Sequence, residues 1–261
     1  MKNVKMGKSK IEWCDKVWNP ITGCTKISEG CGNCYAERMA RRLAGRCGYP
    51  KDNPFAVTLH PERLNEPLRW KKPQRVFVCS MGDLFHKDVK QVSLMEIFMT
   101  IRSCPQHTFL ILTKRAKEMC QFFWRFRNIH CSPNSTPNLW LGVSVENQKT
   151  ADKRIPLLLQ IPAIKRFVSY EPALGPVNFM KYIKLPGHGS GEFNFWIDLI
   201  DWIIMGGESG PGARPMKIEW ARDVKNQCVN AGIPFFYKQG PGDDGKVCKM
   251  PMLDGRRWRN G

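Results

Sequence analysis

From residue 75 onward, short apolar runs alternate with helical segments, and this order constrains the fold more than any other feature. The runs are rich in β-branched and aromatic residues without apolar–polar alternation, which is typical of strands buried on both faces of a parallel sheet. They occupy residues 75–80, 107–113, 139–144, 165–170, 201–206 and 234–238. Between them, apolar residues recur at helical spacing over 92–104, 114–126, 150–160 and 217–232, and the last segment ends at a helix-stopping Gly232. The pattern predicts βα units and a mostly parallel sheet.

Polar residues follow each predicted strand. They are Ser80 and Asp83, Thr113 and Lys114, Ser144 and Glu146, Glu171, Glu208, and Lys238 and Gln239. In a β/α barrel these strand ends gather on one face, where the active site lies. An open doubly wound sheet would also collect them at its carboxyl edge. Because several are acidic in a basic chain, we expect a lined cavity and predict a full or partial parallel β/α (TIM-like) barrel.

The remaining segments are less regular. A first strand is expected over 17–22, followed by a cysteine-rich loop and a helix over 35–44. The proline-rich stretch 46–74 and the stretch 185–195 are predicted to be irregular insertions, and the glycine-rich, charged tail 240–261 is expected to be mobile until it meets a ligand. We see neither an internal repeat nor a second domain, so residues 1–261 are predicted to form a single domain.

The charge balance is strongly basic. The chain has 41 Lys and Arg against 23 Asp and Glu, a net charge of +18. Individual basic runs are explained by solvated helix faces, but together they favour a nucleic acid or nucleotide-derived substrate. No apolar run reaches the roughly 18 residues of a membrane span, and the basic N-terminal segment has no apolar stretch of the signal-peptide kind. We therefore expect a cytoplasmic protein without a membrane partner.

Three cysteines lie on one short loop. Cys24, Cys31 and Cys34 have the spacing C-x6-C-x2-C. A reducing cytosol disfavours disulfides, and an odd total of 11 cysteines cannot pair completely. A structural zinc site needs four ligands, which Cys14, Cys47 or His60 could complete. A [4Fe–4S] cluster also generally takes four thiolates, and a cluster held by three leaves one iron open to a small molecule.

The three-cysteine arrangement resembles that of the radical S-adenosylmethionine superfamily. There, three cysteines after the first barrel strand bind a [4Fe–4S] cluster, and the open iron is chelated by S-adenosylmethionine. The second gap and the aromatic Tyr35 match that superfamily, whereas the first gap is three residues longer than its usual C-x3-C-x2-C. Nearly the whole chain also resembles a phage-associated family of unassigned function that is inferred to be radical S-adenosylmethionine-like. The matching stretches are "WNPITGC…GCGNCYAERMA", "TLHPERLNEPLRW", "SMGDLFH", "LTKR", "LGVSVENQ", "RFVSYEPALGPV" and "GGESGPGARPM".

The resemblance implies a role for several residues. It makes Cys24, Cys31 and Cys34 the cluster ligands. It implies that the segment after the second strand contacts the methionyl amino group of S-adenosylmethionine. This segment is Ser80, Met81, Gly82 and Asp83, and Asp83 replaces the usual glutamate. Contact with the ribose hydroxyls falls to Ser144 and Glu146. Contact with the substrate or the adenosyl group falls to Gly206, Gly207 and Glu208.

Glu171 is expected either to contact the ribose hydroxyls as well or to accept a proton from the substrate. Glu171, Glu208 and Lys238 are thus the candidate catalytic residues. Each glutamate has an alternative explanation as a helix N-terminal cap, where negative charge is favoured. Lys114 and Lys238 could equally be solvated or position a phosphate.

The resemblance, together with the basic charge, implies a radical enzyme. It would cleave S-adenosylmethionine to a 5′-deoxyadenosyl radical and modify a nucleic acid or nucleotide-derived substrate, with an electron donor as partner. The phage association favours DNA by analogy, and no oligomeric state is specified. The alternative is a non-enzymatic nucleic-acid-binding protein stapled by zinc or by a closed iron–sulfur cluster, in which Cys14 would have a metal role.

Overall fold

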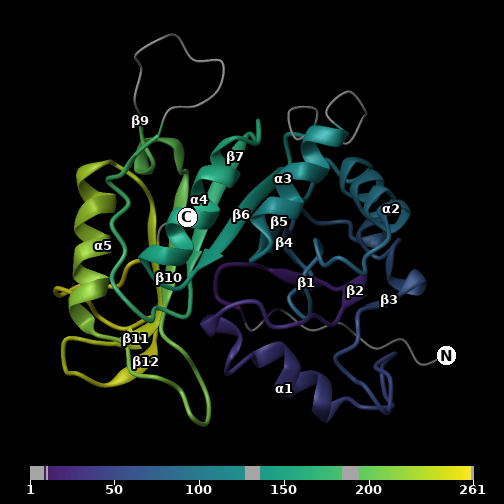
Figure 1. The fold of residues 1–261 in the computed structure, drawn as a ribbon, viewed down its shortest axis with the longest axis horizontal. Coiled ribbons are helices and arrows are strands. Elements are labelled where there is room, and N and C mark those ends of the chain that lie inside the picture. The colour runs from purple at the N-terminus through teal and green to yellow at the C-terminus, as the bar shows by residue number, and fades with distance from the viewer. Residues whose placement is uncertain (1–8, 10, 127–135, 184–193, 260–261) are drawn as a thin grey trace.

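An eight-stranded sheet forms the centre of the molecule (Figure 1). The computed structural model describes residues 9, 11–126, 136–183 and 194–259. The strands follow the order β1 (Lys16–Trp18), β4 (Arg75–Val78), β5 (Thr108–Thr113), β6 (Leu139–Val145), β7 (Lys165–Tyr170), β10 (Trp202–Gly206), β11 (Phe235–Pro241) and β12 (Val247–Lys249). The first seven run parallel and β12 pairs antiparallel with β11. With β1 and β12 as its edges, the curled sheet confirms the prediction of a parallel β/α barrel in its partial form.

Helices connect consecutive parallel strands as the periodicity predicted, except between β7 and β10, where the described residues contain two short strands and a 3-10 helix. They are α1 (Tyr35–Arg42), α2 (Gln91–Arg102), α3 (Ala116–Arg125), α4 (Gln148–Leu159) and α5 (Ile218–Asn230). The side chain of Asn147 accepts a 3.1 Å hydrogen bond from the backbone N–H of Thr150 and thereby starts α4. Gly232 follows α5 with φ of 68°, a conformation that favours glycine and ends the helix. In Figure 1, α1 lies apart from the helices α2 to α5.

The two faces of the sheet differ in what covers them. On one face Val76, Ile111 and Val143 belong to the large core that includes the apolar residues of α2 to α5. On the inner face, aromatic side chains fill the space toward the amino ends of the strands, where the Trp13 ring lies 4.6 Å from Phe77. This aromatic plug leaves only the carboxyl ends of the inner face available for a cavity.

Shorter elements complete the fold. Strands β2 (Ile21–Thr22) and β3 (Thr58–Leu59) form one small antiparallel sheet, and β8 (Tyr182–Ile183) and β9 (Asn194–Phe195) form another. The predicted insertion 46–74 contains β3 and the 3-10 helices Pro61–Arg63 and Pro67–Arg69; two more are Glu29–Cys31 and Ile197–Leu199. Of the predicted insertion 185–195, residues 185–193 lie outside the described residues.

The C-terminal segment, for which we expected mobility, packs against the sheet. Strand β12 lies in it, Leu253 is fully buried, and the backbone oxygen of Trp258 accepts a 3.0 Å hydrogen bond from the backbone N–H of Tyr237. Among the helices that the structure describes, none has both the length and the apolar character that crossing a bilayer requires.

Candidate cluster and cofactor site

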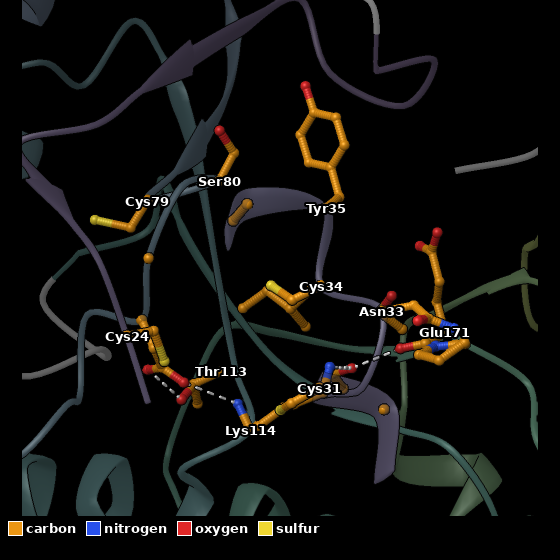
Figure 2. Close-up of a pocket in the computed structure, with 18 of the residues that line it drawn as sticks. Cys24, Cys31, Asn33, Cys34, Tyr35, Cys79, Ser80, Thr113, Lys114 and Glu171 are labelled. Atoms are coloured by element: carbon orange, nitrogen blue, oxygen red, sulfur yellow. Dashed lines mark hydrogen bonds between the residues drawn. The ribbon is translucent and has the colours of Figure 1, made fainter. Parts of the chain in front are cut away.

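A cavity of about 270 Å³ opens at the carboxyl ends of the parallel strands, and Cys24, Cys31 and Cys34 all line it (Figure 2). Its wall also includes the predicted strand-end residues Ser80, Gly82, Asp83, Thr113, Lys114, Ser144, Glu171, Gly207 and Glu208. The structure therefore gathers residues from five different strand ends around three thiols. The volume lies near the lower end of the usual range for small-molecule sites, about 300–1,000 Å³.

Two glycines let the cysteine loop begin directly on the end of β4. Gly23 donates a 2.9 Å backbone hydrogen bond to Met81 and forms an isolated parallel bridge with Gly82. A Cβ at Gly23, whose φ is 87°, would lie 2.1 Å from the backbone oxygen of Ala56. A side chain there would collide with the backbone of Phe55 and Ala56 and displace the loop, and Cys24 with it.

An ion pair holds the first cysteine. Arg115 Nη1 lies 3.1 Å from Asp83 Oδ2 and donates a 3.1 Å hydrogen bond to Cys24 Sγ, while its Nη2 donates to the backbone oxygen of Thr25 at 2.9 Å. The Asp83 carboxylate also accepts a 2.7 Å hydrogen bond from Thr113. Burial raises the pKa of the Cys24 thiol to about 11, and Arg115 acts in the opposite direction. Asp83 thus orients the arginine that fixes Cys24.

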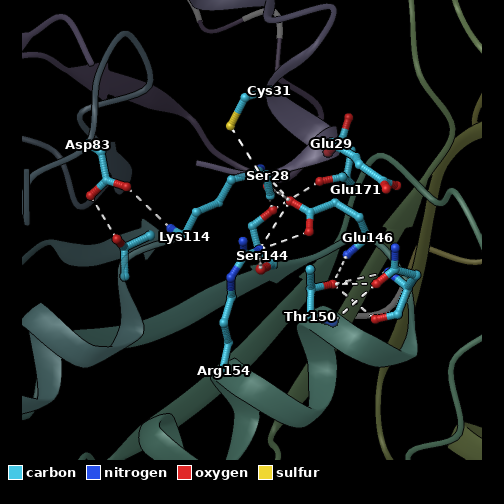
Figure 3. Close-up of polar contacts among 12 residues, drawn as sticks. Ser28, Glu29, Cys31, Asp83, Lys114, Ser144, Glu146, Thr150, Arg154 and Glu171 are labelled. Atoms are coloured by element: carbon cyan, nitrogen blue, oxygen red, sulfur yellow. Dashed lines mark hydrogen bonds and ion pairs between the residues drawn. The ribbon is translucent and has the colours of Figure 1, made fainter. Parts of the chain in front are cut away.

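A second pair supports the middle of the loop (Figure 3). Glu146 is fully buried and lies 3.0 Å from Arg154 Nη1. The hydroxyl of Ser28 donates a 2.8 Å hydrogen bond to Glu146 Oε1, and a Cβ at Gly30 would lie only 2.5 Å from Glu146 Cγ. The loop therefore rests directly on this carboxylate, which faces the loop backbone.

A third pair holds the end of the loop. Glu208 Oε1 lies 2.5 Å from Arg214 Nη2, and the same nitrogen donates a 2.9 Å hydrogen bond to the backbone oxygen of Glu29. Asn33, which lies between the second and third cysteines, donates a 2.8 Å hydrogen bond to Glu208 Oε2. The three carboxylate–arginine pairs, Asp83–Arg115, Glu146–Arg154 and Glu208–Arg214, thus fix the cysteine loop at its start, middle and end.

The Glu208–Arg214 pair makes the stability of the loop depend on pH in the acidic range. Hydrogen bonds from Arg214 lower the pKa of Glu208 from 4.5 to about 2. Because the folded-state pKa is the lower one, the carboxylate stabilises the fold above its ordinary pKa of 4.5, and this contribution is lost as pH falls toward 2. We expect the thermal midpoint of the metal-free chain to fall more steeply over this window than that of Glu208→Gln. Parallel pH profiles for the two chains would contradict this role of Glu208.

The inner face of the cavity carries the remaining polar groups. Lys114 Nζ donates a 2.8 Å hydrogen bond to Ser144 Oγ, which in turn donates to the backbone oxygen of Glu171 at 2.9 Å. Glu171 Oε1 lies 2.5 Å from Lys238 Nζ, and this contact joins the residue that follows β7 to the middle of β11. Lys114 is thus a cavity-lining cation that lies 2.8 Å from Ser144 Oγ and 3.6 Å from the carboxylate of Glu146.

Not every predicted residue faces the cavity. Met81 is buried against Ala40 of α1, Glu146 lies beneath the loop, and Gly206 and Lys238 lie outside the lining. The partners missed by sequence reasoning are Arg115, Arg154, Arg214 and Asn33. Only their position in the fold reveals them, although the stretches "LTKR" and "GGESGPGAR" end on two of these arginines.

The described residues form no preassembled site for a single metal ion. Within the described part of the chain, no three His, Cys, Asp or Glu side chains come close enough to share one ion. Zinc would hold its sulfur ligands at bonds of about 2.3 Å from one centre, whereas a cluster lets each thiolate bind a different iron. The fourth ligands considered from sequence, Cys14, Cys47 and His60, are absent from the cavity lining.

A fourth thiol, Cys79, borders the cavity but belongs to the core. It is 3% exposed, and burial raises its pKa to about 12. Figure 2 shows its sulfur directed away from Cys31 and Cys34. Of the four cysteines in the lining, Cys24, Cys31 and Cys34 are therefore the three that are not buried in the core.

Comparisons with known proteins place the chain in a family. Among solved structures, a cysteine-to-serine mutant of spore photoproduct lyase is similar, with a TM-score of 0.45, 10% sequence identity, and coverage of 97% of this chain and 73% of that chain. No curated protein matches the sequence. A family profile matches residues 8–260, nearly the whole chain. The chain therefore belongs to the family described as "Protein of unknown function (DUF5131)".

Proposed function

We propose that this protein is a radical S-adenosylmethionine enzyme that acts on a nucleic acid or nucleotide-derived substrate. The observation that carries the proposal is the meeting of three thiols from one loop in one cavity, whose wall is completed by residues from five strand ends. Cys24, Cys31 and Cys34 would hold a [4Fe–4S] cluster and leave one iron open. When bound, the cluster would pass one electron from an external donor to S-adenosylmethionine, releasing methionine and a 5′-deoxyadenosyl radical that removes a hydrogen atom from the substrate.

The protein's own residues would bind and orient the reactants. Lys114 is placed to pair with the carboxylate of S-adenosylmethionine, because its ammonium group lies in the cavity wall beside Ser144. Ser144 and Ser80 offer hydroxyls to polar groups of the ligand. The aromatic plug below the cavity excludes water from its floor.

Glu171 and Lys238 are the candidates for proton handling. Their side chains are 24% and 20% exposed and form an ion pair of 2.5 Å, and Glu171 lines the cavity. Glu208 and Asp83, in contrast, are occupied by arginines. We therefore assign them to positioning of the loop.

Iron analysis after anaerobic purification tests the proposal directly. We expect about four irons and matching acid-labile sulfide per chain, with a reduced-state electron paramagnetic resonance spectrum that changes when S-adenosylmethionine is added. Stoichiometric zinc, or iron whose spectrum does not change when S-adenosylmethionine is added, would refute the radical mechanism. Those outcomes would favour the metal-stapled nucleic-acid-binding protein.

A further inference from the structure

An exposed aromatic ring stands at the rim of the cavity. Tyr35, the first residue of α1, lines the cavity and yet is 56% exposed. Figure 2 shows its ring directed away from the thiols of Cys31 and Cys34. The ring thus offers a flat surface beside the entrance without filling the site.

Basic side chains continue from this ring along α1. Tyr35, Arg38 and Arg42 are three and four residues apart and so lie on one face of the helix. The guanidinium of Arg46 donates a hydrogen bond to the backbone oxygen of Arg42, which extends the positive charge past the end of α1. Arg38 donates to the backbone oxygen of Ser209 at 2.8 Å, which ties this face to the loop on the other side of the cavity.

The local charge is strongly positive. Residues 24–51 contain six Lys and Arg and two Glu. One of the two acids, Glu37, is already bound by Arg41 at 2.7 Å and Lys26 at 3.3 Å, and these contacts lower its pKa. The face of α1 that leads to the cavity therefore attracts a polyanion.

We propose that Tyr35 and the arginines of α1 bind single-stranded nucleic acid and deliver one unstacked base to the cavity. This inference deepens the proposed function and rests on it for the chemistry, but not for the binding. Tyr35 would stack a base, as aromatic side chains do in proteins that bind single strands. The arginines would contact successive phosphates of the same strand.

The distances favour a polymer over a free nucleotide. From Tyr35 to Arg42 the helix rises about 10 Å, and Arg46 lies beyond. One nucleotide in the cavity would not reach the far arginines, whereas a strand leaving the cavity would pass along them. A base inside an intact duplex is stacked on both sides, so a single strand, whose bases can unstack, is the form that enters.

Fluorescence anisotropy on the full-length purified chain tests this surface. The probes are a labelled DNA strand of about 20 nucleotides, its duplex, and RNA of the same sequence, with an unlabelled mononucleotide as competitor. We expect Tyr35→Ala to weaken single-strand binding by about fivefold to a hundredfold, and Tyr35→Phe to restore it. We expect Arg42→Glu to weaken binding to strands of any sequence. It should also reduce the slope of log affinity against log salt concentration by about one.

Lys153→Glu is the matched control, because it makes the same charge change at an exposed position on α4. An equal loss of affinity in Lys153→Glu and Arg42→Glu would overturn the proposal in favour of net charge alone. Mononucleotide competing as well as the unlabelled strand, or a duplex binding as tightly as the single strand, would also overturn it. A preference for DNA or for RNA supports the proposal and identifies the sugar.

The iron measurements keep this inference separate from the proposed function. Arg42 lies outside the cavity lining, so Arg42→Glu is expected to retain the iron content and the spectral response of the unaltered chain. In one outcome the protein binds single strands selectively, with the losses expected for Tyr35→Ala and Arg42→Glu, and yet gives no spectral response to S-adenosylmethionine. This result would refute the radical chemistry and support the nucleic-acid-binding surface. A normal cofactor response without strand selectivity would do the reverse.

Discussion

Replacing Cys24, Cys31 or Cys34 by alanine, one at a time, is expected to lower the iron content from about four atoms per chain to nearly none. Each thiol would bind a different iron. In the described part of the cavity wall the other cysteine is Cys79, whose sulfur is directed away from Cys31 and Cys34 and cannot replace a lost ligand. The three carboxylate–arginine pairs that hold the loop involve the cysteine sulfurs only through the Arg115 bond to Cys24 Sγ and a 3.8 Å contact between Ser28 Oγ and Cys31 Sγ, so the variants should keep the fold. Iron and sulfide assays after anaerobic reconstitution, together with far-ultraviolet circular dichroism, measure both expectations.

Two other cysteines serve as controls for that experiment. Cys79→Ala and Cys14→Ala are expected to bind iron like the unaltered chain, since Cys79 points into the core and Cys14 lies in the aromatic plug. Loss of iron in Cys79→Ala would show a fourth thiolate and hence a closed cluster. Loss of a bound metal in Cys14→Ala would favour the stapled-protein alternative.

The largest expected loss of stability comes from the buried pair beneath the loop. Glu146→Ala leaves Arg154 as an uncompensated charge that is 4% exposed, and breaking such a pair typically costs about 3–5 kcal/mol. It also removes the acceptor of the Ser28 hydroxyl, so the loop should retain iron less well. The free energy of unfolding from urea titration, combined with the rate of iron loss to a chelator, tests both consequences.

The double variant Glu146→Gln, Arg154→Met is the control for the buried charge. It removes both ions and should recover much of the unfolding free energy, because replacing a buried pair by neutral groups of similar volume is often nearly neutral. Its iron retention should stay below that of the unaltered chain if Ser28 needs the carboxylate. A Glu146→Ala chain with unchanged stability but weaker S-adenosylmethionine binding would contradict the brace and favour a ribose contact.

Sequence periodicity was sufficient for the sheet because strand and helix patterns are local. The runs at 75–80 and 139–144 have no polar alternation, and each becomes a strand buried in the sheet, β4 and β6. The expectation that strand ends gather followed from parallel topology alone. Ser80, Lys114 and Ser144 meet that expectation, because all three line the cavity.

The orientation of the carboxylates was beyond the same reasoning. Glu146 follows its strand just as Ser144 does, but it turns toward an arginine 8 residues later and a serine 118 residues earlier. Asn33 and Glu208 meet across 175 residues. Such contacts depend on how the loop folds over the sheet, which no local pattern encodes.

The sequence by itself thus determined the βα order, the set of residues at the strand ends and the three-thiol loop, because each follows from spacing along the chain. Only the tertiary structure decided that Asp83, Glu146 and Glu208 bind arginines while Glu171 binds a lysine. The physical reason is that a buried carboxylate must be neutralised by a nearby cation, and three-dimensional packing selects which cation that is.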